Sequence, residues 1–481
     1  MRYYVFAIGG TGARCLESLV FLCAMGLGPK ELHPILVDPD SSNGNVNRTR
    51  TLITKYKAIR DQLTNSVEGD YFYTDILYED TEDKKDTKLR IPNVINPNAG
   101  LDTGMNTLAH FIEYNNNLSL SDDKYLADLL YSKREMDMDM TEGYRGVPSI
   151  GSILMTNVKD HPFWPVLTSA LKNDSSSKAF IFASVFGGTG ASGYPVISQL
   201  LKKAAPNARV GGALLLPYFR LQDPKNLGTQ TEAFNNDEIL PDSNFFLMNT
   251  KAACEFYKNN FSKNVSNYVL GDDLDICSQY ENYSKGSADQ ENNSHMIELF
   301  AAYAALDFGV REDGNYKDFY HIQVQNPDRE PKTYEVTASD LPHFQKGLVF
   351  ENFSLFYNYI MDINRLIETS KTSLLNKIAW LRNMKFNGRY IMDHKDELKP
   401  LVSFCQSYKQ WIQQIHTNSA NLNVVSPELR MDCLISENQD KYAGYPISRM
   451  DKKLHGRKTN HERLVNAFIK VLSAARVERG K

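Results

Sequence analysis

The chain has 481 residues, of which 42% are hydrophobic and 23% are charged, and its net charge is −4. This size allows two or three domains with buried cores, and the balanced charge gives no electrostatic basis for binding nucleic acid or an anionic membrane. No apolar run reaches the roughly 18 residues that span a bilayer, and the N-terminus reads as a strand and not as a signal peptide. Six dispersed cysteines without a CxxC pair indicate reduced thiols in the cytoplasm and argue against a zinc site.

The N-terminal segment predicts a strand, a glycine turn and a helix. An apolar run over residues 3–8 precedes the turn, and helical spacing of apolar residues follows from about 13 to 25. The turn resembles the GxGxxG dinucleotide fingerprint only loosely, because the third glycine is missing. Its candidate nucleotide-binding residues are Gly9, Gly10, Thr11 and Gly12.

A second strand over residues 33–37 ends at Asp38. An acid at this position of such a fold typically binds a ribose hydroxyl, but aspartate is equally favoured in turns and helix caps, and both readings stay open. Residues 41–140 are polar and predict an insertion or an elaborated crossover.

A third glycine-containing loop runs through residues 141–151 into a helix. Gly143 and Gly146 permit close approach of the backbone to a ligand. Arg145 between them either offers its guanidinium to a phosphate or is an exposed loop arginine.

The strongest pattern lies in residues 178–201, which again read as strand, glycine turn and helix. Glycines at such a turn let backbone N–H groups close on a phosphate, and the helix that follows directs its positive end there. The alternative is a tight turn without a ligand. The candidate residues are Gly187, Gly188, Thr189, Gly190 and Ala191.

Strands and helices go on alternating downstream of this turn. The pattern predicts strands over 208–219 and 267–270, a helix over 249–260 and a long helix over 291–308. This alternation, with glycine turns at strand ends, indicates an α/β fold with a parallel, doubly wound sheet and a ligand at its carboxyl edge.

Four loops in this order resemble those of the tubulin/FtsZ superfamily, and within it the divergent bacterial tubulin-like proteins. Residues 186–193, FGGTGASG, are similar to the family signature GGGTGSG, with Phe186 in place of the first glycine and one extra small residue. GVPSIGS at 146–152 is similar to GANPEVGR, and LLPYF at 215–219 to the strand ending TKPF. The loop over residues 9–13 is similar in position and character to the first nucleotide loop of the family. The resemblance covers residues 1–310 and implies that they form a Rossmann-type GTPase domain.

The resemblance implies binding of GTP or GDP, with Mg²⁺ as an accompanying ion. The amides of Gly10, Gly146 and Gly188 would bind the phosphates, and Thr189 would add a hydroxyl. An early asparagine of the central helix binds the guanine in this family, so Asn292 or Asn293 would do so here.

The family makes head-to-tail filaments in which an acid from the neighbouring subunit activates water. The pattern that carries this acid is incomplete here. Asp313 follows the central helix, and Glu298 ends the alternative spacing Asn293-x-His295-x-x-Glu298. We therefore expect weak or conditional GTP hydrolysis.

Residues 311–481 depart from the family. They predict an α+β region, with strands over 319–325 and 333–336, that becomes mainly helical and ends in a basic tail over 449–481. The tail could bind an acidic partner or nucleic acid, or be a solvated helix end.

The expected partners are further copies of the chain or proteins encoded beside it in a bacterial genome. An alternative is a nucleotide-dependent scaffold or switch that does not polymerise. A remote alternative is an NAD(P)-dependent oxidoreductase, suggested only by the glycines after the first strand.

Overall fold

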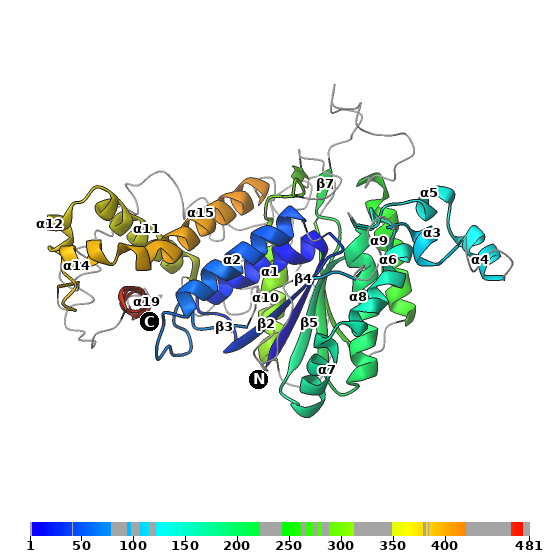
Figure 1. The fold of residues 1–481 in the computed structure, drawn as a ribbon, viewed down its shortest axis with the longest axis horizontal. Helices are drawn as coiled ribbons and strands as arrows, with labels where there is room; N and C mark the ends of the chain where they lie inside the picture. The colour runs from blue at the N-terminus through cyan, green and yellow to red at the C-terminus, as the bar shows by residue number, and fades with distance from the viewer. Residues whose placement is uncertain are drawn as a thin grey trace, which may run out of the picture.

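We describe the chain from a computed structural model (Figure 1). The described residues are 2–40, 42–77, 94–97, 106–114, 122–141, 143–221, 243–260, 265–272, 278–280, 288–311, 349–378, 381–382, 384–419 and 463–474.

A parallel sheet forms the centre of the molecule. Its strands are β1 (Tyr3–Ile8), β2 (Glu31–Val37), β3 (Asp75–Ile76), β4 (Val94–Ile95), β5 (Lys178–Ser184), β6 (Arg209–Leu215) and β8 (Val265–Leu270). They lie in the order β3-β2-β1-β5-β6-β8, and β4 also pairs with β2. All pairings between these strands are parallel. Because β3 and β4 lie on the same side of β2, the arrangement has the 3-2-1-4-5-6 order of dinucleotide-binding folds.

Helices cover both faces of the sheet (Figure 1). One face carries α1 (Gly9–Ala24), α2 (Gly44–Arg60) and α10 (Met296–Val310), and the other carries α6 (Pro148–Met155), α7 (Phe163–Asn173), α8 (Gly188–Ala204) and α9 (Phe246–Asn260). Alternate side chains of β1 enter the two cores, with Tyr3, Val5 and Ala7 facing α1 and α10. The entire strand is buried, as expected at the centre of a parallel sheet.

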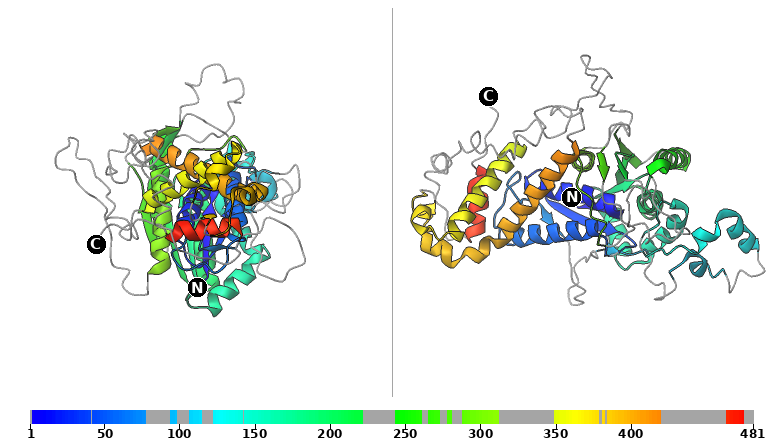
Figure 2. Two further views of the ribbon diagram at one scale, coloured as in Figure 1. Left: turned by 90° about the vertical axis from the view of Figure 1, so that its left-hand side faces the viewer. Right: turned by 90° about the horizontal axis from the view of Figure 1, so that it is seen from above.

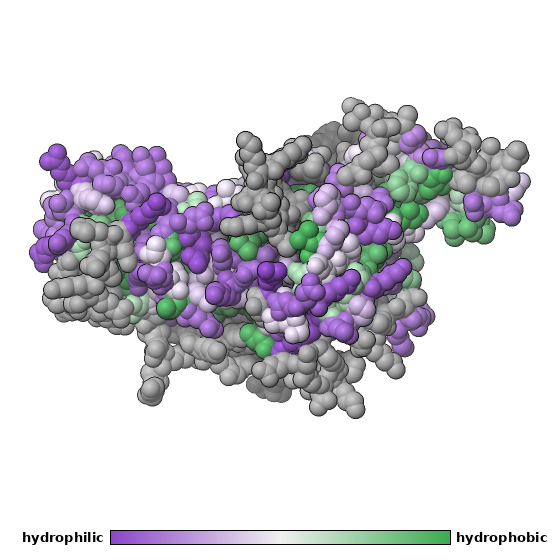
Figure 3. All heavy atoms as spheres, turned by 60° about the horizontal axis from the view of Figure 1, so that its bottom comes forward, coloured by the Kyte–Doolittle hydropathy of each residue, from purple (hydrophilic) through white to green (hydrophobic). Residues whose placement is uncertain are grey.

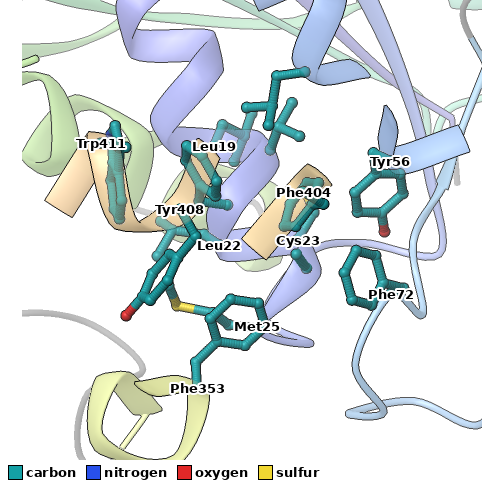
Figure 4. Packing of buried hydrophobic residues seen from close by; sticks show 14 of the residues in the cluster. Leu19, Leu22, Cys23, Met25, Tyr56, Phe72, Phe353, Phe404, Tyr408 and Trp411 are labelled. Atoms are coloured by element: carbon teal, nitrogen blue, oxygen red, sulfur yellow. The ribbon is translucent and has the colours of Figure 1, made fainter. Parts of the chain in front are cut away.

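The C-terminal helices share the first of these cores. They are α11 (Val349–Glu368), α12 (Thr372–Leu375), α14 (Gly388–Asp393), α15 (Lys399–Ser419) and α19 (Leu464–Ala474). Helix α15 lies beside α2 in every view (Figures 1 and 2). Its Phe404, Tyr408 and Trp411 lie close to apolar residues of α1 (Figure 4). The rings of Phe21 and Trp411 stack with their centroids 4.5 Å apart.

A small arm projects from the opposite end of the molecule (Figure 1). It consists of α3 (Leu108–Phe111), α4 (Asp122–Leu130) and α5 (Lys133–Met136). Tyr125, Leu126, Leu129 and Leu130 of α4 are exposed, and apolar surface appears at this end of the molecule in Figure 3.

The remaining short elements lie outside the main sheet. Strands β7 (Phe219–Leu221) and β9 (Ser278–Tyr280) form a separate parallel pair. The described 3₁₀ helices are η1 (Thr156–Asp160), η4 (Ser243–Phe245) and η7 (Lys395–Leu398). Among the described helices, none is long and apolar enough to cross a membrane.

The predicted α/β fold with a parallel sheet is confirmed, whereas several element boundaries shift. Helix α1 begins at Gly9 and α8 at Gly188, because each glycine turn itself forms the first helical turn. The central helix begins at Met296 instead of 291, because His295 caps it. Within the predicted insertion, residues 44–60 form α2 and pack on α1. Two predictions lie outside the described residues. They are the strands over 319–325 and 333–336 and most of the basic tail, of which only residues 463–474 are described.

Candidate functional site

The candidate site lies where the connections of the sheet change direction. Strand β1 pairs with β2 on one side and with β5 on the other. After β1 the chain therefore builds one half of the sheet, and with β5 it begins the other half on the opposite side of β1. The turns after β1 and β5 therefore emerge side by side at the carboxyl edge. Ligands of open α/β sheets bind in the crevice at such a switch point.

The two glycine turns touch each other. A Cβ atom at Gly9, whose φ is +70°, would lie 3.3 Å from the Cβ of Thr189. A Cβ at Gly12 would lie 2.8 Å from the carbonyl carbon of Ala7 and 2.9 Å from the carbonyl oxygen of Phe182, so only glycine lets α1 start this close to β1 and β5.

The loop over residues 143–146 completes the convergence. A Cβ at Gly188 would lie 2.8 Å from the amide nitrogen of Gly146, and a Cβ at Gly143 would lie 3.7 Å from the hydroxyl of Thr189. Gly143, Arg145 and Gly146 all have left-handed φ angles, of +94°, +42° and +83°. A non-glycine residue held at positive φ stores roughly 1–3 kcal/mol of strain, and such strain concentrates at ligand sites.

Three helices begin at this meeting point without a side-chain cap. They are α1 after Ile8, α6 after Val147 and α8 after Gly187. The neighbouring helices differ, since Asn43 caps α2 and His295 caps α10. Uncapped N-termini keep backbone N–H donors available and carry a positive partial charge, which together favour an anion.

Asp38 follows β2 at the same edge and is buried. Its Oδ1 accepts a hydrogen bond from the amide of Asp40 at 2.9 Å, while Oδ2 has no hydrogen-bond partner among the described residues. Burial raises the pKa of this carboxyl to about 8, while the hydrogen bond from the Asp40 amide opposes the rise and the charge of Asp40 adds to it. Burial, and to a smaller extent the charge of Asp38, raises the pKa of Tyr144, which places Asp38 near the third loop. Below about pH 8 such a carboxyl is neutral, so it can form a hydrogen bond with a ligand hydroxyl as donor or as acceptor.

A cluster of carboxamide side chains lies beside the first turn. A Cβ at Gly10 would lie 2.9 Å from Nδ2 of Asn45. That Nδ2 donates to the carbonyl of Gln290 at 2.7 Å, and the amide of Asn292 donates to Oδ1 of Asn45 at 2.9 Å. Asn43 donates from Nδ2 to Oε1 of Gln290 at 2.7 Å. The segment before α10 is thus fastened to the start of α2.

The orientation of the Asn292 carboxamide follows from its neighbours. Arg14 NH1 donates to its Oδ1 at 3.4 Å, and Asn45 Nδ2 donates to the same oxygen at 3.3 Å. A guanidinium can only donate, so the atom facing Arg14 must be the oxygen. The amide group of Asn292 is left to donate elsewhere.

Glu298 lies in the interior, fully buried, with both carboxylate oxygens bonded. Oε1 accepts from Arg14 Nε and from the hydroxyl of Tyr218, each at 2.5 Å. Oε2 accepts from the amide of His295 at 2.9 Å, which completes a capping box at the start of α10. These contacts favour a structural role over the catalytic role that the sequence suggested. Asp313, the other candidate acid, lies outside the described residues.

The other predicted residues lie either in the converging turns or close to them. Thr11 and Thr189 are half-buried in two of the converging turns, and Ala191 is buried in the first turn of α8. Asn293 is exposed and Asn292 half-buried just before α10. Among the described residues, no group of three or more His, Cys, Asp or Glu is placed to hold a metal ion.

Sequence reasoning missed the residues that join the site to α2 and α10. Arg14, Asn43, Asn45 and Gln290 were not predicted, because their partners lie more than 240 residues away in the chain. One signal was available in the sequence. Arg14 follows the first glycine turn on the apolar face of a helix, and a buried arginine requires an acidic partner.

No protein-family model and no curated protein matches this chain. The structure shows an α/β fold with a Rossmann-like parallel sheet and three glycine turns that converge at its switch point.

Proposed function

We propose that the chain is a tubulin-like protein that binds GTP or GDP at the carboxyl edge of its sheet. The observation that carries the proposal is the convergence of the three uncapped helix N-termini at the contact between Gly9, Gly143 and the 187–190 turn. A polyphosphate fits this geometry, because it has several anionic groups and the site has several groups of amide donors.

The nucleoside would extend from the phosphates toward the carboxamide cluster. Asp38 would form a hydrogen bond with a ribose hydroxyl, as an acid at this point of the fold commonly does. The amide group of Asn292 would donate to an acceptor on the base. Guanine carries an acceptor oxygen where adenine carries an amino donor, so this orientation supports a guanine preference.

The Mg²⁺ ion that accompanies a triphosphate would be held mostly through phosphate oxygens and water, as this ion prefers. The half-buried hydroxyls of Thr11 and Thr189 fit such an arrangement.

Isothermal titration with GTP, GDP, ATP and NAD⁺ tests the proposal. We expect GTP and GDP to bind at micromolar concentrations and ATP and NAD⁺ to bind far more weakly. Binding of NAD⁺ alone would instead support the oxidoreductase, and equal binding of ATP and GTP would remove the guanine preference.

Self-assembly is the further part of this proposal and is tested by sedimentation with GTP and GDP. The buried Glu298 favours a second candidate, a nucleotide-binding scaffold or switch without turnover. GTP-dependent pelleting with phosphate release supports assembly and hydrolysis. GTP binding without either result supports the scaffold.

A further inference from the structure

The segment over residues 288–295 lies between the candidate site and helix α15. On the site side, Asn43 and Asn45 bond to Gln290, as described above. On the other side, two side chains of α15 bond to the backbone of Ser294. Gln414 accepts from the Ser294 amide at 3.1 Å, and Asn418 donates to the Ser294 carbonyl at 2.8 Å.

Ser294 is buried and forms hydrogen bonds with three helices, α1, α2 and α15. Its hydroxyl donates to Oε2 of Glu17 on α1 at 3.0 Å and accepts from NH2 of Arg48 on α2 at 3.3 Å. Ser294 is fully buried and Asn418 is nearly so. Leaving a buried backbone group unpaired costs about 1–3 kcal/mol, so these contacts fix the path of the segment.

We propose that Gln414 and Asn418 are positioning residues of the nucleotide site. By holding the backbone of Ser294, they set where Gln290 and Asn292 stand, because only one residue separates Asn292 from Ser294. The C-terminal helix α15 thereby determines how tightly the site holds the base. This inference rests on the proposed function, since it places the base at Gln290 and Asn292.

The phosphate part of the site approaches this segment where Gly10 lies against Asn45, but its three turns are fixed by other contacts. The turns at Gly9, Gly143 and Gly188 are held by one another and by the ends of β1 and β5. Loosening the 288–295 segment should therefore weaken binding of the base and leave binding of the polyphosphate unchanged. A general loss of folding would weaken both.

The test compares Asn418→Ala and Gln414→Ala with a matched control, Gln413→Ala, on the exposed face of the same helix. A fluorescent GTP analogue is displaced from each full-length protein by GTP and by inorganic tripolyphosphate. We expect about tenfold weaker binding of GTP in both test variants, or about 1.4 kcal/mol, because binding must then order a loosened segment. Tripolyphosphate should bind the wild type and all variants alike, and Gln413→Ala should match the wild type with both ligands.

An unchanged GTP affinity in both test variants, or an equal loss for GTP and tripolyphosphate, would overturn the inference and leave the proposed function standing. A wild-type chain that binds no GTP analogue overturns the proposed function and the inference with it. If Asn418→Ala does not fold, Gln414→Ala alone tests the inference, because Gln414 is only half-buried and its truncation disturbs the fold less.

Discussion

Asp38 buries its carboxyl at the rim of the sheet, where burial raises its pKa to about 8. The pKa of an ordinary aspartate is 3.8, so between about pH 4 and pH 8 the unfolded chain releases this proton while the folded chain keeps it. The contribution of this carboxyl to the free energy of unfolding is fully present below pH 4 and is lost as the pH rises toward 8. A buried acid that opposes folding at neutral pH is typical of a binding residue.

Replacing Asp38 by asparagine should remove this pH dependence. The Asp38→Asn variant keeps an oxygen for the Asp40 amide but has no proton to release. We expect it to be more stable than the wild type at pH 7 by a few kcal/mol, at about 1.4 kcal/mol per pKa unit, and equally stable near pH 4. Urea unfolding of both proteins from pH 4 to pH 8 measures the difference, in which other titrating groups such as His295 cancel. Parallel pH profiles would show that the Asp38 pKa is not raised.

Arg14 and Glu298 form a buried ion pair behind the first glycine turn. Arg14→Met would leave the Glu298 carboxylate without its cation, and we expect a loss of about 3–5 kcal/mol in unfolding free energy. The double variant Arg14→Met/Glu298→Leu removes both charges and should recover much of this loss. Denaturant unfolding at pH 7 compares the wild type, Arg14→Met, Glu298→Leu and the double variant. If the double variant were as unstable as the sum of its single changes, the two side chains would not be coupled.

At the scale of single elements, the C-terminal end of α10 is held by a lysine from the start of β5. The buried ammonium of Lys178 donates to the carbonyl oxygens of Phe308, Gly309 and Arg311 at 3.2, 2.6 and 2.9 Å. The last carbonyls of a helix have no partner within it, and a cation there also complements the helix dipole.

Lys178→Met should therefore destabilise the protein through α10. We expect a loss of about 2 kcal/mol or more, because charge-assisted hydrogen bonds are removed and buried carbonyls lose their donor. The control Lys203→Met, at an exposed position of α8, should change stability by less than about 0.5 kcal/mol. Hydrogen exchange of the last turn of α10 would localise the effect, and unchanged exchange there would contradict this role.

The strand–glycine–helix units could be predicted because their signals are local. The apolar runs before Gly9 and Gly187 and the helical spacing after them are carried by about twenty consecutive residues each. The helix starts were placed too late because a glycine turn reads as a loop in sequence, whereas here the first helical turn consists of glycines. The start of α10 shifted because a histidine cap is not a usual N-cap signal.

At the scale of the whole molecule, α15 packs on α1 and α2 within the core that covers one face of the sheet. The helical character of the C-terminal region could be read from its apolar spacing, but its place could not. Contacts such as Trp411 with Phe21, or Asn418 with Ser294, join segments separated by more than 120 residues. Their pairing depends on tertiary packing that no local pattern contains.

The central claim is that the three glycine turns bind one polyphosphate, and a pair of matched substitutions tests it most directly. Gly146 and Gly69 have φ angles of +83° and +91°, and a Cβ at either position meets nothing within 4 Å, but only Gly146 lies in the converging turns. Alanine at either site should cause a similar strain of about 1 kcal/mol. Titration with GTP should show at least tenfold weaker binding for Gly146→Ala and wild-type affinity for Gly69→Ala. Equal GTP affinity in both variants would contradict the account.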